Sequence, residues 1–151
     1  MSECYLVESD NKYHFVTTSL KQLFLQMLFN YLFVNQDDHA RNFSFMCSDD
    51  YKWRVTPAYD ITFSKGMKQT REHQTTLNAK VLSQVNLQDI VNIATEFSIN
   101  LEFVSSAIET MNSLKNTKLA SLINKYEISL AKQEQVLQEV MKRDFQGELN
   151  E

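Results

Sequence analysis

The order of three segments most constrains how this chain can fold: a helical pattern, a polar stretch, and a hairpin pattern. Apolar residues recur at helical spacing over 20–32, and a capping box at 19–22 marks the expected start of the helix. The polar stretch 35–42 follows directly, and a strand–turn–strand pattern over 43–55 then leads to Asp60. We therefore expect two polar segments that are distant in sequence to converge beside the end of a buried helix.

Three side chains in these two segments are of the kind that holds a metal-bound phosphate. Asp37 lies five residues before Asn42, and Asp60 follows the hairpin. Carboxylate and amide oxygens are hard ligands for divalent cations, which neutralise the charge of a phosphoryl group in transfer. The same order and spacing is found in kinases of several families. An ordinary polar loop would explain the composition of the stretch but neither the spacing nor the second Asp.

The run FNYLFVNQDDHARNFSF…WRVTPAYDITFS resembles the catalytic segment of the HipA-like Ser/Thr kinases, the toxins of bacterial toxin–antitoxin modules. The resemblance implies that Asp37 is the catalytic base and that Asn42 and Asp60 hold Mg²⁺ with ATP in a complete kinase. It places His39 in the catalytic D-x-H-x-x-N loop, in a structural or phosphate-side role, and Arg41 among the cofactor-binding residues.

The resemblance extends over about residues 20–97 and includes the segment 76–80, which is similar to the usually Gly-richer segment that follows the second metal Asp. The same loop pattern is also found in lipid kinases of the phosphatidylinositol 3-kinase type. It therefore favours kinase chemistry without identifying the substrate.

The segment before the first helix is too short for the half of a kinase that grips ATP. That half needs a glycine-containing loop over the phosphates and a Lys that pairs with them. The two glycines, Gly66 and Gly147, both follow the catalytic segment, and Lys12 is the one Lys or Arg within 1–17. We expect a C-terminal lobe that is inactive in isolation and needs a separately encoded N-terminal lobe.

The expected fold is mainly α with a small β-hairpin, similar to the C-terminal lobe of a protein-kinase-like fold. Asn86 and Asn100 can each cap a helix, and a third helical pattern runs over 118–145 without Pro or Gly. The expected division is a short extended segment 1–17, a lobe 18–146 with the catalytic loop and metal Asp in 35–60 and helices in 86–146, and an acidic tail 147–151.

Charge and composition limit the partners. The net charge of −4 argues against direct nucleic-acid binding, so contact with DNA would pass through an antitoxin of the DNA-binding repressor type. A protein substrate is expected, and no membrane. A locally basic group after the second Asp could meet nucleotide or substrate phosphate: Lys65, Lys68, Arg71 and Lys80.

Cysteine and histidine usage suggests neither disulfides nor zinc. Cys4 and Cys47 are expected to be free thiols, with Cys47 a small buried side chain in a strand. The three histidines lack zinc-ligand spacing. With no signal-peptide pattern and no apolar run long enough for a bilayer, a cytoplasmic location is expected.

Two functions of different classes remain, with a third in reserve. The first is the catalytic lobe of a split Ser/Thr kinase that transfers the ATP γ-phosphoryl group to a protein hydroxyl. The second is an inactive, truncated kinase-like domain that serves as a protein-binding module in a toxin–antitoxin system. The reserve is a metal-dependent phosphohydrolase that uses Asp37, Asp38, His39 and Asp60.

Overall fold

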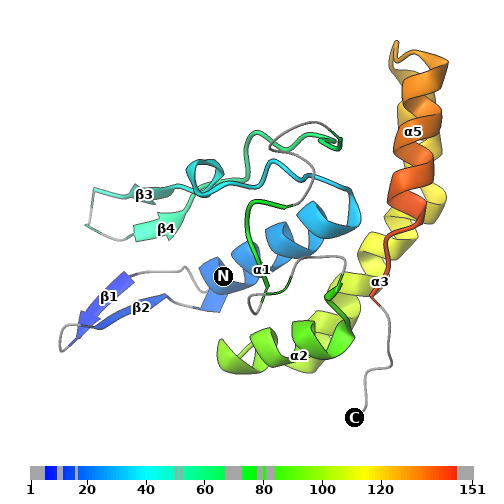
Figure 1. The fold of residues 1–151 in the computed structure, drawn as a ribbon. Coiled ribbons are helices and arrows are strands. Elements are labelled where there is room, and N and C mark those ends of the chain that lie inside the picture. Colours follow the sequence, from blue (N-terminus) through cyan, green and yellow to red (C-terminus); the bar gives the residue numbers. More distant parts are fainter. Residues whose placement is uncertain are drawn as a thin grey trace.

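The computed structural model describes residues 6–9, 12–15, 17–49, 51, 53–66, 73–77, 80 and 84–145 of the chain. Over these residues it contains five α-helices, one short 3₁₀ helix and two antiparallel hairpins (Figure 1). The elements are β1 (Leu6–Ser9), β2 (Lys12–Phe15), α1 (Thr17–Leu32), η1 (Ala40–Asn42), β3 (Phe45–Cys47), β4 (Trp53–Val55), α2 (Leu87–Glu96), α3 (Leu101–Thr117), α4 (Leu119–Lys125) and α5 (Leu130–Met141). The expectation of a mainly helical fold with a small hairpin is confirmed.

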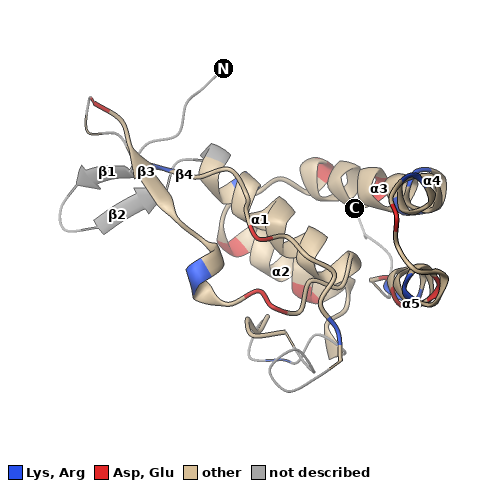
Figure 2. Ribbon diagram, turned by 90° about the horizontal axis from the view of Figure 1, so that it is seen from above, with Lys and Arg blue, Asp and Glu red and all other residues tan. Residues whose placement is uncertain are grey.

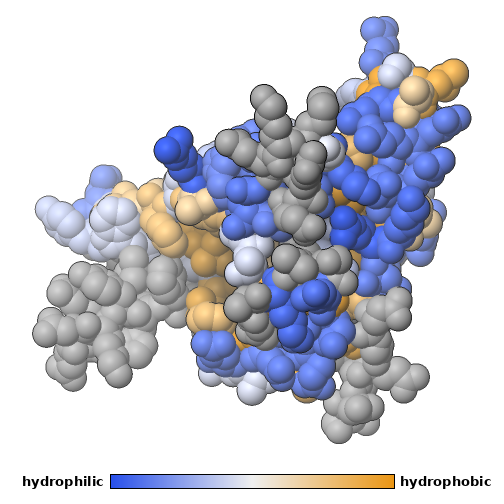
Figure 3. Space-filling view, viewed as in Figure 1, coloured by the Kyte–Doolittle hydropathy of each residue, from blue (hydrophilic) through white to orange (hydrophobic). Residues whose placement is uncertain are grey.

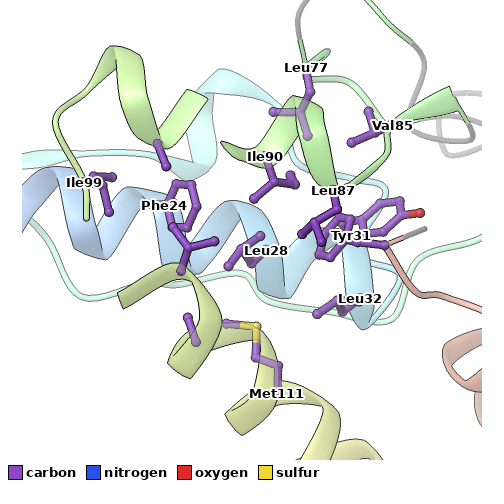
Figure 4. Close-up of a cluster of buried hydrophobic side chains, with 14 residues drawn as sticks. Phe24, Leu28, Tyr31, Leu32, Leu77, Val85, Leu87, Ile90, Ile99 and Met111 are labelled. Carbon is purple, nitrogen blue, oxygen red and sulfur yellow. The ribbon is translucent and has the colours of Figure 1, made fainter. Parts of the chain in front are cut away.

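Helix α1 is the centre of the core. Its buried positions Phe24, Leu28, Tyr31 and Leu32 are spaced three or four residues apart or adjacent, so they form one face of the helix. That face meets buried side chains of α2 and α3, as the close-up in Figure 4 shows. The core side chains that come from outside α1 are Leu77, Val85, Leu87, Ile90, Ala94, Ile99, Val104, Ala107, Met111 and Phe145.

The start of α1 differs from the expected one. The helix begins at Thr17, so Ser19 lies inside the first turn and is not its N-cap. The Ser19 hydroxyl accepts a hydrogen bond from the backbone N–H of Val55 at 3.1 Å. The predicted capping box is therefore wrong, because this serine serves a tertiary contact with β4 that local sequence does not reveal.

The helix starts in the second half follow the sequence closely. Asn86 and Asp89 form a reciprocal capping box at α2, and the Asn100 side chain accepts from the backbone N–H of Phe103 at α3. The third pattern is split, however, because α4 ends at Lys125 and α5 begins at Leu130. Tyr126, which follows α4 at this break, is exposed.

The hairpin β3–β4 extends away from the helices in Figure 1, with Phe45 paired to Val55 and Cys47 to Trp53. Cys47, at the outer end of this hairpin, is exposed. The expectation that it is a buried side chain is therefore wrong. None of the helices in the described part of the chain is both long and apolar enough to cross a bilayer.

The end of the described chain packs back on α1. The ring of Phe145 stacks on Tyr31 with centroids 4.6 Å apart, and the Tyr31 hydroxyl donates to the carbonyl of Asp144 at 3.3 Å. Lys115 of α3 donates to the carbonyl of Arg143 at 2.5 Å. The residues after α5 thereby fix this end of α1, from which the polar stretch departs.

Candidate functional site

The polar stretch leaves α1 through a residue in the left-handed conformation. Val34 has φ of 60°, which turns the chain out of the helix. Asn35, only 2% exposed, is tied back to the last turn: its backbone N–H donates to the carbonyl of Asn30 at 2.8 Å, and its side chain donates to Asn30 Oδ1 at 3.0 Å. The start of the loop is therefore fixed relative to the core helix.

Ser64, four residues after Asp60, joins the two polar segments. Its backbone N–H donates to the carbonyl of Val34 at 3.0 Å, and its hydroxyl donates to Asn35 Oδ1 at 3.2 Å. The same hydroxyl accepts from the backbone N–H of Asp37 at 2.9 Å. Segments 27 residues apart are thus held side by side through Ser64.

Asp37 and His39 lie on the outer side of the loop. The atoms Asp37 Oδ1 and His39 Nε2 are 3.9 Å apart, and both side chains are about 40% exposed. His39 Nδ1 is buried and has no hydrogen-bond partner among the described residues. This pair presents a carboxylate and an imidazole to solvent, while the backbone of Asp37 is held by its hydrogen bond to the Ser64 hydroxyl.

Asn42 ends the loop and folds back onto its start. It closes the 3₁₀ helix η1 and is only 5% exposed. Its Nδ2 donates to the backbone carbonyl of Asp37 at 2.8 Å, so the donor half of the amide is engaged and only the oxygen half can bind a cation. The carbonyl of Asn42 in turn accepts from Gln26 of α1 at 3.5 Å.

The segment that carries Asp60 is attached to the loop through its neighbour. The Tyr59 hydroxyl donates to the carbonyl of Arg41 at 2.7 Å and lies 2.5 Å from the hydroxyl of Ser44. Asp60 itself is exposed and adopts φ of 52°, a left-handed conformation that is uncommon for residues other than glycine. The structure brings Tyr59 to the loop, while no described contact joins the Asp60 side chain to Asp37 or Asn42.

Arg41 lies in η1 with an exposed side chain. Its backbone carbonyl, rather than its guanidinium, makes the contact with Tyr59. The side chain is therefore available at the surface beside the loop, and Figure 2 shows this part of the ribbon with basic and acidic positions next to each other.

Asp38 entered the sequence analysis only as a residue of the reserve hydrolase, and its structural role was not predicted. It is 2% exposed and accepts hydrogen bonds from His73, Gln74 and Thr75. Burial raises the pKa of Asp38, but the hydrogen bonds from His73 and Thr75 outweigh it, so the pKa lies below its ordinary value of 3.8. No local sequence feature indicates this role, because the hydrogen-bond partners of Asp38 lie 35 to 37 residues further along the chain.

Residues 5–124 match the sequence profile of the HipA-like C-terminal domain family. The chain belongs to this family. The resemblance to the C-terminal part of HipA-like proteins is thereby confirmed, and the matched region contains the loop, both hairpins and the helices through most of α4. No curated protein matches the chain.

The two described members of the basic group after Asp60 of this HipA-like domain, Lys65 and Lys80, form ion pairs with other segments. Lys65 pairs with Glu139 of α5, and Lys80 pairs with Asp89 of α2 at 2.6 Å. Lys68 and Arg71 lie outside the described residues. Two of the four predicted phosphate contacts therefore serve ion pairs between segments.

The donors for a cation are oxygen atoms, which suits Mg²⁺ in character. Asn42 can offer one amide oxygen and Asp60 one exposed carboxylate, and a magnesium ion bound through few protein ligands keeps its remaining positions for water and phosphate. Among the described residues no three His, Cys, Asp or Glu side chains gather as a metal-binding group. The chain thus fits a cation that is shared with a nucleotide better than one that is held by protein alone.

A largely apolar groove of about 580 Å³ lies beside the Asp60 segment, between α1 and α3. Ala58 and Ile61, on either side of Tyr59 and Asp60, form part of its wall. Figure 3 shows apolar residues gathered where the β3–β4 hairpin meets the helices. The other lining residues are Gln22, Leu25, Gln26, Phe29, Phe103, Ser106, Ala107, Thr110, Met111 and Leu114.

Proposed function

We propose that this HipA-like domain is the catalytic lobe of a serine/threonine kinase and transfers the γ-phosphoryl group of ATP to a protein hydroxyl once an N-terminal lobe completes it. The observation that carries the proposal is the closed loop. Asn42 bonds to the carbonyl of Asp37, and the carboxylate of Asp37 faces solvent beside His39. A carboxylate that acts as general base toward a substrate hydroxyl must be exposed to the substrate and held in a fixed position.

Asp37 would accept the proton of the substrate hydroxyl. As the hydroxyl oxygen forms its bond to the γ-phosphorus, the bond from that phosphorus to the β–γ bridging oxygen breaks, and ADP leaves with the electron pair. His39, with one ring nitrogen 3.9 Å from the Asp37 carboxylate, would hold the carboxylate or a phosphate oxygen in place.

Asn42 and Asp60 would hold Mg²⁺, which offsets the charge on the phosphates when ATP is bound. Arg41, exposed on the same turn as Asn42, would lie on the nucleotide side. These roles rest on the family resemblance together with the chemistry of the side chains, and each has a matched variant that can test it.

The test is phosphoryl transfer by the chain mixed with an N-terminal lobe of the same family, followed with radiolabelled ATP. Asp37→Asn should lower transfer by roughly 10²–10⁴-fold, whereas Asp49→Asn, the same change at an exposed turn of the β3–β4 hairpin, should leave it intact. Equal transfer by the Asp37→Asn variant and the unmodified chain would refute the assignment of the base.

A second function, an inactive binding module within a toxin–antitoxin system, is favoured by one observation. Large apolar side chains are exposed on α4, on α5 and between them: Leu122 is 49%, Tyr126 59% and Leu130 77% exposed. Exposed apolar side chains are common where proteins bind partners. An antitoxin that binds the chain while no added lobe restores transfer would favour this function.

The metal-dependent hydrolase is disfavoured by the environment of Asp38. Its two carboxylate oxygens accept four hydrogen bonds, about as many as an ionised carboxylate can accept. A metal ligand at this position would have to break them.

A further inference from the structure

The segment from Asp37 to the extended residue His39 places successive side chains on opposite sides. Asp37 and His39 face outward and are about 40% exposed, whereas the side chain of Asp38 is 3% exposed and faces the interior. This alternation is the ordinary geometry of an extended chain. When the side chain of Asp38 is held toward the interior, the side chains of Asp37 and His39 must therefore point toward solvent.

The Asp38 carboxylate is bound by one short segment from elsewhere in the sequence. Oδ1 accepts from the backbone N–H groups of Gln74, at 2.7 Å, and Thr75, at 3.3 Å. Oδ2 accepts from His73 Nδ1 at 3.0 Å and from the Thr75 hydroxyl at 2.5 Å. Hydrogen bonds to an ionised acceptor are stronger than neutral ones, and this carboxylate makes four.

The segment that binds Asp38 is itself attached to the core. The side chain of His73 is 2% exposed, and its ring lies 6.3 Å from that of Tyr31 of α1. Leu77, at the other end of the segment, belongs to the core cluster. Asp38 thus joins the outward-facing loop to a support that is held at two points.

We propose that Asp38 is a positioning residue: by binding residues 73–75 it fixes the backbone from which Asp37 and His39 face outward, and so sets the catalytic geometry of the lobe. The inference rests on the proposed function and adds a residue that does not touch substrate or metal. Asp38 would act on turnover through the orientation of Asp37, because a small misplacement of a reacting group slows the chemical step.

The variant that best tests this role changes Thr75, which lies outside the loop. Thr75→Val removes the hydroxyl that donates to Asp38 while keeping the shape of the side chain, Thr75→Ser restores the hydroxyl, and Thr76→Val makes the same change at the exposed neighbouring residue. With an N-terminal lobe present, Thr75→Val should lower kcat by roughly ten- to hundredfold. KM for ATP should stay unchanged, and Thr75→Ser and Thr76→Val should both resemble the unmodified chain.

A purely structural role for the Asp38 contacts would give a different result. The Thr75→Val variant would then melt at a lower temperature, but its kcat per folded molecule would be unchanged, and the proposal would be overturned.

A second measurement on the chain alone separates this inference from the proposed function. In nuclear magnetic resonance spectra, Thr75→Val should shift the resonances of Asp37 and His39 as well as those of residues 73–77, whereas Thr76→Val should not shift the two loop residues. If the completed enzyme transfers no phosphate, the proposed function fails, and these spectra still decide the positioning role. Loop resonances that do not move in Thr75→Val would refute it.

Discussion

The side-chain amide of Asn42 donates a hydrogen bond to the backbone carbonyl of Asp37 at 2.8 Å. The first and last functional positions of the loop are therefore in direct contact, and Asn42 is a structural part of the loop as well as the proposed metal ligand. A substitution at Asn42 should therefore affect both the stability of the loop and metal binding.

Asn42→Ala should lower the free energy of unfolding by about 1–3 kcal/mol, because it leaves the part-buried carbonyl of Asp37 without its donor. Urea unfolding of the pure chain measures this loss. Asn92→Ala, which removes an exposed amide from α2, is the control and should change stability by less than about 0.5 kcal/mol. Equal effects of the two variants would show that the loop contact contributes nothing.

Ser64→Ala should be destabilising by about 1–3 kcal/mol, since it removes a hydroxyl that donates to Asn35 and accepts from the backbone N–H of Asp37. Faster hydrogen exchange at the amide of Asp37 should accompany the loss, because that amide loses its acceptor. Ser121→Ala, at an exposed hydroxyl of α4, serves as the control. Unchanged exchange at Asp37 would contradict this account.

The stability of the fold should fall in acid because of Asp38. Its pKa in the folded chain lies below 3.8, so the ionised carboxylate contributes stability in full above the unfolded-state pKa near 3.8. That contribution is lost as the pH falls below 3.8 through the folded-state pKa. Urea unfolding across this range measures the slope, which should be shallower in Asp38→Asn. If the free energy of unfolding of the variant falls as steeply with decreasing pH, the effect belongs to other carboxylates.

Asp37→Asn and Asp60→Asn should differ when the lobe is completed. The first variant keeps the metal ligands but lacks the base, so transfer should fall by roughly 10²–10⁴-fold while affinity for Mg²⁺-ATP changes little. The second lacks a charged ligand, so Mg²⁺-dependent nucleotide affinity should weaken as well. Calorimetric titration with ATP and Mg²⁺ distinguishes them. Equal loss of affinity in both would contradict the separate roles.

The chain by itself should fold and yet transfer no phosphate. Helices α1, α2 and α3 share one core. The two glycines, Gly66 and Gly147, both follow the loop of Asp37, whereas a kinase covers the ATP phosphates with a glycine-containing loop that precedes it. Circular dichroism should report a helical protein with cooperative melting, and radiolabelled ATP should label no substrate. Transfer by the pure chain that disappears in Asp37→Asn would overturn this expectation.

Local sequence patterns determined the features that depend on residues near one another in the sequence. The helical spacing of apolar residues located α1, α2 and α3, the side chains of Asn86 and Asn100 gave two helix starts, and the spacing of Asp37, Asn42 and Asp60 pointed to the family. These features could be predicted because helix periodicity and capping act over a few residues.

Only the tertiary structure decided which polar residues support the loop. Asp38 is adjacent to Asp37, but its partners are 35 to 37 residues further along, and Ser64 reaches Asp37 over 27 residues. The same holds for Ser19, which suggested a helix cap and instead contacts β4. Hydrogen bonds of this kind depend on which distant donor the folded chain brings within reach of a buried acceptor, and a single sequence carries no local record of that pairing.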